Sequence, residues 1–408
     1  MKVQIKKTGN TTIRKNHRSI VINYIRKYGS VSRTELFEKT NISKPTVTRI
    51  VEELLNDGIV VSTGILGTSS GRKPVKIELN PSAYYSIGIN ISKSNIYASI
   101  VDLSMNIKHK SAINIKSVNN DNDFITTVIN IIDRLIKESE ISYEKILGIG
   151  IGVSGNINFR SGEIVDFGFM HKLPCIKLKV SLENKFNLKV LVDNNANTRV
   201  LGEYWYGLGR GYNNVIFIIC GEGIGSGIIS GKKILRGKNN VTGEFGHMIV
   251  NLDGRKCSCG KYGCIESYCS TGAIELRTKE AIKGGRGSKS LLGKVEEVDA
   301  ISYKDICQFA KAGDRLCIEI LEESAFILST GLYNLIGIVD PEIIVLSGDL
   351  FDLSQLFFDK VVMMTREKLI MSNLNDIVFE KRRVEDSLYE IGAAALIYKS
   401  FFNDDKTF

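Results

Sequence analysis

The stretch that decides the fold is Gly243–Glu266, which reads GEFGHMIVNLDGRKCSCGKYGCIE. It holds one imidazole and three thiols within 18 residues, and its glycines allow the backbone to fold back on itself. Three thiolates and one imidazole are a ligand set typical of tetrahedral structural Zn²⁺ sites. We therefore expect a structural zinc bound by four side chains: His247, Cys257, Cys259 and Cys264.

A disulfide, or a set of thiols buried for unrelated reasons, is the alternative to a metal site. The chain begins with a basic segment rather than a signal peptide, and it has no run of 18 apolar residues. These features predict a cytoplasmic protein with no membrane partner. Disulfides are rare in that reducing compartment, so metal binding is the favoured interpretation.

Two carboxylates flank the expected metal ligands. Glu244 lies three residues before His247, and Glu266 lies two residues after Cys264. A bound metal would therefore fix the spacing of the two carboxylates. Carboxylate oxygens accept charge-assisted hydrogen bonds, which suits the hydroxyl groups of a polyol.

The motif ExGH, followed ten residues later by CxCGxxGCxE, resembles the signature of the ROK family of repressors, open reading frames and sugar kinases. The resemblance implies a two-lobed α/β actin-like domain of the sugar-kinase type, with a structural zinc beside a sugar pocket. It leaves open whether this chain phosphorylates a sugar or senses one.

The excess positive charge is confined to the first fifth of the chain. The formal net charge is +9, and residues 1–80 hold 15 Lys and Arg against 6 Asp and Glu. Residues 81–408 hold 39 of each and are neutral. A localised basic module is the electrostatic signature of nucleic-acid binding. We therefore expect double-stranded DNA as a partner of residues 1–80.

The same 80 residues show the pattern of a winged helix-turn-helix. A basic arm at 1–15 precedes three expected helices, which apolar periodicity and capping residues place at 16–28, 32–40 and 43–55. Two β-rich runs, 59–63 and 75–79, bracket a glycine-rich loop that would form the wing. A helical hairpin with solvated charges is the alternative.

The third helix is the candidate recognition helix. Ser43 is its expected N-cap, and Pro45 lies in its first turn, where a missing N–H costs nothing. Its outward side chains suit a major groove, and a basic wing tip suits a narrow minor groove. The candidate DNA-binding residues are Ser43, Lys44, Pro45, Thr46, Thr48, Arg49, Arg72 and Lys73.

Two segments depart from what the resemblance implies for a kinase. Where family kinases have D-x-G-G-T, whose Asp serves Mg²⁺ and whose glycines admit phosphate, residues 90–94 read NISKS. VDNNAN at 192–197 resembles the family's ENDAN, whose Asp is the general base, but Asn195 occupies that position. An amide cannot take up the proton, although it can hydrogen-bond a hydroxyl. We therefore expect no catalytic residue and no enzyme.

The resemblance also implies a sugar pocket and a turn that would approach phosphate in a kinase. The run Cys220–Gly227 resembles that turn, and we favour a structural role for it here. Gly155 lies in a strand-end turn whose backbone would approach the sugar. The candidate sugar-binding residues are Gly155, Asn194, Asn195, Glu244, His247 and Glu266.

These observations predict a sugar-responsive transcriptional repressor. Its expected domains are the DNA-binding module 1–80, a first α/β lobe 81–200 and a second lobe 201–408 that carries the zinc motif. A homodimer, with a tetramer as the alternative, would match a palindromic operator, because two-fold symmetry in the protein fits two-fold DNA.

A monosaccharide is the expected effector of this repressor. The layout resembles that of xylose repressors, so xylose is the first candidate, although other monosaccharides would use the same carboxylates. Two other functions remain open. One is an ATP-dependent sugar kinase with an appended DNA-binding module. The other is a DNA-binding protein whose pocket is vestigial, and which binds constitutively or responds to a partner protein.

Overall fold

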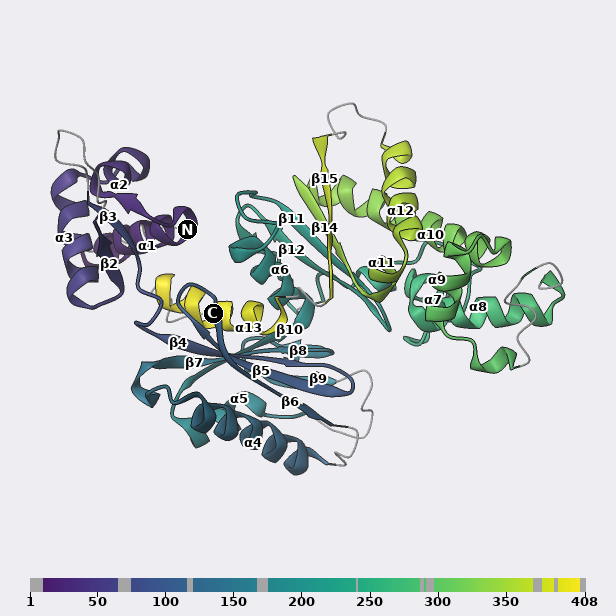
Figure 1. The fold of residues 1–408 in the computed structure, drawn as a ribbon, viewed down its shortest axis with the longest axis horizontal. Helices are drawn as coiled ribbons and strands as arrows, with labels where there is room; N and C mark the ends of the chain where they lie inside the picture. Colours follow the sequence, from purple (N-terminus) through teal and green to yellow (C-terminus); the bar gives the residue numbers. More distant parts are fainter. Residues whose placement is uncertain are drawn as a thin grey trace, which may run out of the picture. The chain divides into compact units, whose positions relative to one another are not determined.

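The chain folds into two compact units, Met1–Thr198 with Tyr389–Phe408 and Arg199–Leu388. The computed structural model describes residues 10–64, 75–115, 120–166, 175–239, 241–286, 290, 297–369, 376–384 and 388–403. Figure 1 labels the helices and strands. Within the described ranges, every helix is too short or too polar to cross a bilayer.

The first unit begins with three helices and a small sheet, as predicted. The helices are α1 (Asn10–Tyr28), α2 (Arg33–Thr40) and α3 (Lys44–Asn56). The strands, in the sheet order β1–β3–β2, are β1 (Val31–Ser32), β3 (Lys76–Leu79) and β2 (Val60–Thr63). All pairings are antiparallel, so β2 and β3 form the hairpin that flanks a wing.

Helix α1 is longer than the sequence suggested. It begins at Asn10, so residues 10–15, expected to belong to a flexible arm, are helical. Arg14 donates to Glu53 at 2.7 Å and Arg18 to Asp57 at 3.2 Å, which ties this end of the helix to α3 and to the residue that follows it. These contacts join residues 39 positions apart, which local periodicity does not reveal.

A capping box starts α2 where the sequence predicted it. The Ser32 side chain accepts from the Glu35 N–H, and the Glu35 carboxylate accepts from the Ser32 N–H. In α3, Ser43 occupies the N-cap position and Pro45 the first turn, but the Ser43 hydroxyl pairs with the Thr46 hydroxyl at 2.9 Å instead of capping the backbone. The cap position is therefore confirmed and its side-chain bond is not.

The lobe that follows in the first unit is a five-stranded sheet in the order β10–β7–β4–β5–β6. Its strands are β4 (Tyr85–Ile91), β5 (Asn95–Asp102), β6 (Ile107–Asn114), β7 (Ile146–Val153) and β10 (Lys189–Asn194). β10, β7 and β4 are parallel, and β4, β5 and β6 form an antiparallel meander. Strand β7 is buried almost throughout, because its isoleucines and glycines face packed layers on both sides.

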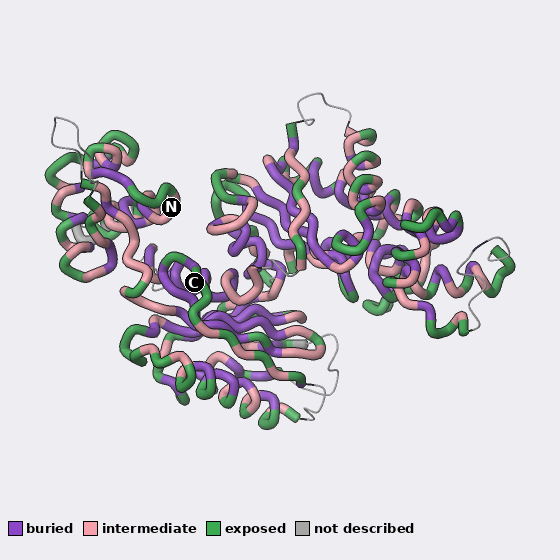
Figure 2. The backbone as a smooth tube through the Cα atoms, in the orientation of Figure 1, coloured by how far each residue is buried: buried purple, intermediate pink, exposed green. Residues whose placement is uncertain are grey.

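Helices cover both faces of this sheet. Figure 1 shows α4 (Asp121–Ser139) and α5 (Leu178–Phe186) on one face and α13 (Tyr389–Asn403) on the other. The apolar residues of the sheet, α4 and α5 form one core. In Figure 2 the strands of this sheet contain long buried stretches, while α4 alternates between buried and exposed residues. A small hairpin, β8 (Asn156–Asn158) and β9 (Glu163–Asp166), follows β7.

The second unit is built on a sheet in the order β13–β12–β11–β14–β15. Its strands are β11 (Val215–Cys220), β12 (Ile224–Ser230), β13 (Lys233–Ile234), β14 (Ile343–Ser347) and β15 (Val378–Arg382). The helices of this unit are α7 (Glu266–Cys269), α8 (Thr271–Lys283), α9 (Tyr303–Lys311), α10 (Arg315–Val339), α11 (Asp349–Leu353) and α12 (Gln355–Lys368). The long apolar α10 lies at the centre of their common core.

The boundary between the units differs from the expected domain limits in two places. Helix α6 (Asn195–Tyr206) crosses it, because the division falls between Thr198 and Arg199. The expected second lobe 201–408 also loses its end, since α13 packs on β4 and β7 in the first unit. A division by chain order alone cannot anticipate a helix that returns to the sheet of the first half.

Candidate functional site

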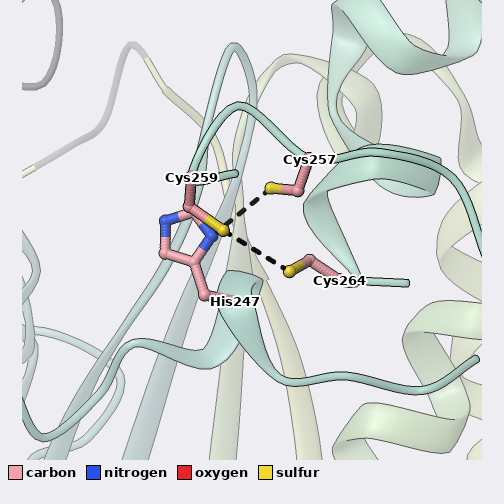
Figure 3. A group of neighbouring side chains, drawn as sticks. All are labelled: His247, Cys257, Cys259 and Cys264. Atoms are coloured by element: carbon pink, nitrogen blue, oxygen red, sulfur yellow. Dashed lines mark hydrogen bonds between the residues drawn. The ribbon is translucent and has the colours of Figure 1, made fainter. Parts of the chain in front are cut away.

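The four expected metal ligands converge in the second unit (Figure 3). His247 ends the short 3₁₀ turn η2 (Phe245–His247), and the cysteines lie on the loop that follows. One ligand atom from each residue lies within 4.8 Å of all the others. His247 Nδ1 is 3.6 Å from Cys257 Sγ, and Cys259 Sγ is 3.7 Å from Cys264 Sγ.

These distances fit a tetrahedral metal ion and exclude a disulfide. Bonds of about 2.3 Å to sulfur and about 2.05 Å to nitrogen place tetrahedral ligand atoms about 3.8 Å (S···S) and about 3.6 Å (N···S) apart. A disulfide would require about 2.05 Å between sulfurs. All eight cysteines of the chain are free thiols. The site is therefore able to hold a metal ion.

Backbone contacts shape the loop that carries the cysteines. The Cys257 N–H donates to the Lys261 carbonyl at 2.8 Å, which closes a tight turn. Gly263 has a φ of 75°, and a Cβ there would lie 1.6 Å from the Asn251 carbonyl oxygen. Only glycine fits this close approach. The folded conformation of the loop therefore requires glycine at position 263.

His247 has one ring nitrogen directed at the metal position and one left over. Because Nδ1 faces Cys257, Nε2 is the nitrogen available to a second partner. A metal ion on Nδ1 would fix the ring and make Nε2–H a donor. His247 as a whole is half-buried.

Glu266 has protein partners on both carboxylate oxygens. Oε2 accepts from the Ile224 N–H at 2.9 Å, and Oε1 accepts from the Ser258 hydroxyl at 3.3 Å. The carboxylate thus joins the cysteine loop to the turn before β12, a link that the sequence did not indicate. Each oxygen has further lone-pair capacity, so a ligand hydroxyl can still be bound.

Glu244 lies at the start of η2, and its residue is exposed. Protein atoms around its carboxyl group raise its pKa by desolvation, Glu266 adds to the increase, and His247 opposes it. Solvent on the exposed side limits the size of this effect. The carboxylate remains an acceptor for hydroxyl donors.

The other three candidate sugar residues lie in the first unit, at neighbouring strand ends. Gly155 follows β7 with a φ of 141°, which only glycine adopts readily. Asn194 ends β10, and its Oδ1 caps α6 by accepting from the Asn197 N–H at 2.7 Å. Asn195 Nδ2 donates to the Ser154 hydroxyl. The six candidate residues therefore form two groups of three, one in each unit.

Asp193, the carboxylate nearest to Asn195 in the sequence, is committed to structure. It is 1 % exposed, and its Oδ1 accepts from the Asn194 N–H and from Asn197 Nδ2 at 2.8 and 2.9 Å. A carboxylate held in this way orders the start of α6.

The glycine-rich run 220–227 contains the end of β11, the turn at 221–223 and the first half of β12. Its Gly221 N–H donates to the Gly223 carbonyl at 3.1 Å, and Glu266 takes the Ile224 N–H. Asp349 lies nearby, and burial and then the neighbouring Asp352 raise its pKa.

A cavity of about 470 Å³ lies beside the cysteine loop in the second unit. The sequence did not indicate it, because its wall combines the loop with the start of α8. Its lining residues are Glu222, Arg255, Lys256, Cys257, Ser258, Glu266, Ser267, Ser270, Gly272, Ala273 and Leu276. Arg255 is held by a bidentate pair with Glu280, with both distances 2.7 Å.

The described part of the candidate DNA interface is the outer face of α3. Ser43, Lys44, Pro45 and Arg49 are exposed, and Thr46 and Thr48 are half-buried. The opposite face is buried through Val47, Ile50, Val51 and Leu54. The expected wing residues Arg72 and Lys73 lie outside the described residues.

The charged groups of α3 are only loosely paired with the rest of the protein. The Arg49 guanidinium lies 3.9 Å from Glu53, which itself receives the shorter bond from Arg14. The Lys44 ammonium lies over the Phe37 ring at 5.0 Å. Exposed contacts of this kind are weak, so both cations are available to phosphate.

The fold and these groups define the class of protein: the chain belongs to the ROK family, whose family model matches residues 86–400. A winged helix-turn-helix DNA-binding model matches residues 14–61. Among curated relatives, the xylose repressor of Caldicellulosiruptor bescii is 29 % identical over 390 residues, covering 95 % of this chain and 97 % of the relative. The xylose repressor of Bacillus spizizenii is 31 % identical over 348 residues, 84 % of each chain.

Two solved structures share the fold. A ROK family transcriptional regulator, a homolog of the E. coli MLC protein, superposes with a TM-score of 0.82 at 22 % identity, covering 96 % of this chain and 97 % of that one. A ROK family glucokinase from Streptomyces griseus, in complex with glucose and AMPPNP, has a TM-score of 0.65 at 28 % identity, covering 77 % and 99 %. The family resemblance and the fold class predicted from the sequence are confirmed.

Proposed function

We propose that this chain is a sugar-responsive transcriptional repressor that does not phosphorylate its sugar. The proposal is carried by Asn195, which stands at the position of the family's catalytic base and hydrogen-bonds Ser154. An amide has no proton affinity near neutral pH, so the chemical step lacks its base. The relatives named xylose repressor, matched along 84–95 % of this chain, support the same function.

The DNA-binding part of the proposal rests on α3. Ser43, Lys44, Pro45, Thr46, Thr48 and Arg49 would enter the major groove, while Arg72 and Lys73 would reach the adjacent minor groove. Each chain contains one such module, so a homodimer would read the two halves of a palindromic operator. A tetramer would bring two such dimers together.

The effector part of the proposal rests on the two groups of candidate residues. Glu244, Glu266 and the Nε2 of His247 would bind sugar hydroxyls from the second unit. Gly155, Asn194 and Asn195 would contribute from the first. A monosaccharide is the proposed ligand of these residues, because its hydroxyl groups can donate to the carboxylates and accept from the amide groups. Xylose is the first candidate, because relatives with this layout bear that name.

We assign zinc as the metal of the cysteine site. When bound, the ion would supply a fixed tetrahedral cross-link among four side chains, with no open position for chemistry. The chain's own contribution is to hold Glu266 against the Ile224 N–H and to present His247 Nε2. The metal is thus structural in this proposal.

The second candidate function is an ATP-dependent sugar kinase. The similarity to a glucokinase solved with glucose and AMPPNP favours it, as does the glycine turn before β12. Asn195 and the altered loop 90–94 both oppose it. The repressor therefore remains the better supported function.

Calorimetric titration with pentoses and hexoses separates these functions. Each sugar is titrated alone and again with ATP and Mg²⁺, while ADP is monitored. Binding of one sugar without ADP formation is the expected result. A second assay selects duplexes from a random pool and then adds that sugar, which should release the selected DNA. ADP formation at each turnover would instead establish the kinase.

A further inference from the structure

The last helix of the chain lies directly on the backbone of the first unit's sheet. A Cβ at Gly88 would be 1.8 Å from the Glu390 carbonyl oxygen, and one at Gly150 would be 1.9 Å from that of Ala393. At these two positions the helix backbone leaves no room for a side chain larger than glycine. α13, β4 and β7 therefore move together as one body.

The direction of α13 is fixed by its neighbours. Ala393 lies beside Gly150 and Ile397 beside Gly148, so the helix runs antiparallel to β7. Its start is directed toward the end of β7 that leads into Gly155, one of the proposed sugar contacts. Farther along, Ser400 pairs with Lys189, the first residue of β10. The helix thus extends from the sugar-binding end of the sheet to the opposite end.

The far end of α13 contacts the DNA-binding module. Asn403 Oδ1 accepts two hydrogen bonds from α1, one from the Ser19 hydroxyl at 3.0 Å and one from Asn23 Nδ2 at 3.1 Å. All three residues are half-buried. α1 is also part of the module's core, through Val21, Ile22 and Ile25. A change at Asn403 therefore acts on the whole module.

The near end of α13 is where the chain comes back from the second unit, since the division falls between Leu388 and Tyr389. The helix consequently has three attachments: the second unit through the chain, the sheet through the glycines, and the module through Asn403. Two neutral hydrogen bonds are the weakest of these, so they are the ones that a change of state would break first.

We propose that Asn403 is the positioning residue through which sugar binding controls the DNA-binding module. The proposal rests on the proposed function and specifies its regulation. Without sugar, the two hydrogen bonds hold α1 on α13 and keep the DNA-binding module in the orientation that binds the operator. Sugar binding displaces α13 together with its sheet, and this displacement breaks the hydrogen bonds of Asn403 to Ser19 and Asn23. The DNA-binding module then loses the orientation that binds the operator.

Amide hydrogen exchange of the full chain, measured for residues 13–28 with and without saturating D-xylose, tests this proposal. In the unmodified protein the sugar should raise exchange in α1. In Asn403→Ala, exchange should be high already without sugar, and sugar should add little. The double variant Ser19→Ala with Asn23→Ala should show the same exchange behaviour as Asn403→Ala. Ser400→Ala, which changes α13 without touching α1, should keep the full sugar response.

Binding measurements on the same variants complete the test. Asn403→Ala should bind the sugar at least as tightly as the unmodified protein, because binding no longer has to open the two hydrogen bonds, and this binding shows that the lobes are folded. The factor by which sugar weakens binding to a selected operator duplex, roughly 5–150 for an allosteric protein, should fall to within about twofold of one. An unchanged factor in Asn403→Ala would overturn the proposal. If D-xylose and every other sugar tested fail to bind, both the proposed function and this inference are wrong. If a sugar binds but exchange in α1 does not change, only this inference is wrong.

Discussion

Asn195 occupies the position of a catalytic base and donates its amide hydrogen to Ser154. Replacing Asn195 by Asp would restore the carboxylate but leave the loop 90–94 and the acidic surroundings of the glycine turn unchanged. We expect Asn195→Asp to show ADP formation no more than about tenfold above background, since proton transfer alone contributes only part of catalysis. Coupled ADP detection measures this. Robust turnover by this single variant would mean that the nucleotide site is intact.

Cys259 is the most exposed of the three cysteine ligands. Replacing it by Ser removes one ligand, so Cys259→Ser should lose the metal and weaken sugar binding by about 10-fold or more, because the loop orients His247 and Glu266. Metal content and calorimetry with the effector sugar measure the two effects. Cys175→Ser, which changes an exposed thiol of the first unit, is the matched control. A metal-free Cys259→Ser protein with an unchanged sugar response would contradict an organising role for the metal.

The metal ligands are the residues that the sequence predicted best. Their spacing within one short loop is local, so His247 and the three cysteines could be assigned without a fold. The bonds of Glu266 to Ser258 and Ile224 could not, because Ile224 lies 42 residues away and the bond depends on how two loops meet. The same holds for Ser154, which reaches Asn195 across 41 residues.

The capping box at the start of α2 makes the DNA-binding module sensitive to acid. Backbone hydrogen bonding from Ser32, followed by the bond from Lys76, lowers the pKa of Glu35 from its ordinary 4.5 to about 2. A carboxyl group whose pKa is lower in the folded than in the unfolded state stabilises the folded state, and this contribution is fully present above pH 4.5. That contribution is lost as the pH falls through about 2.

Glu35→Gln should therefore destabilise α2 at neutral pH and differ less from the unmodified protein as the pH approaches 2. Since the side chain is 45 % exposed, the effect at pH 7 should lie near the lower end of the range for a lost cap, about 0.5–2 kcal/mol. Amide exchange of residues 33–40, compared between variants at each pH, measures it. Glu38→Gln, an exposed change of the same charge on the same helix, should show no such trend.

The outer face of α3 is expected to supply the DNA contacts of the module. Arg49→Ala should weaken binding to a selected operator duplex by about 1–3 kcal/mol if Arg49 reads a base. If it contacts phosphate, the loss should be similar for all sequences and the salt dependence should become shallower. Fluorescence anisotropy at several salt concentrations distinguishes these cases. Lys39→Ala, on the exposed side of α2, is the control, and equal losses for both variants would argue against α3 as the recognition helix.

Among the elements, those with local signals were predicted and those fixed by distant contacts were not. The capping-box residues Ser32 and Glu35, which lie within four residues of each other, predict the start of α2. The early start of α1 depends on Arg14 and Arg18 meeting acidic groups 39 residues away. The return of α13 to the first sheet depends on Gly88 and Gly150, whose role is visible only when the helix is in place.

At the scale of the whole molecule, the sugar and the operator act on the same equilibrium between states. Thermodynamic linkage then requires that operator DNA weaken sugar binding by the same factor by which sugar weakens operator binding. We expect this coupling to be about 1–3 kcal/mol in both directions. Calorimetric titration of sugar into free protein and into the protein–operator complex measures one direction, and anisotropy with and without sugar the other. Because the thermodynamic cycle requires the two factors to be equal, a factor near one in both titrations is the result that would contradict coupling between sugar and operator.

The overall layout was accessible from charge and motif order, because the basic excess lies in residues 1–80 and the family motifs follow in sequence. The exact limits of the units were not. A helix shared by both units, α6, and a helix that rejoins the first, α13, leave no mark in composition. Such features arise from packing between distant segments, which cannot be inferred from a single sequence.

The return of α13 has a consequence for how the protein is made. Ribosomes deliver the chain from its first residue onward, so the face of β4 and β7 that α13 covers, which includes Gly88 and Gly150, emerges long before that helix. The 190 residues of the second unit, Arg199–Leu388, come in between and at roughly 5–20 residues per second take about 10–40 s to synthesise. The later unit is contiguous and can fold as soon as it leaves the tunnel, while the earlier one must wait for the end of translation. During that interval this face of the sheet lacks the helix that covers it in the folded protein.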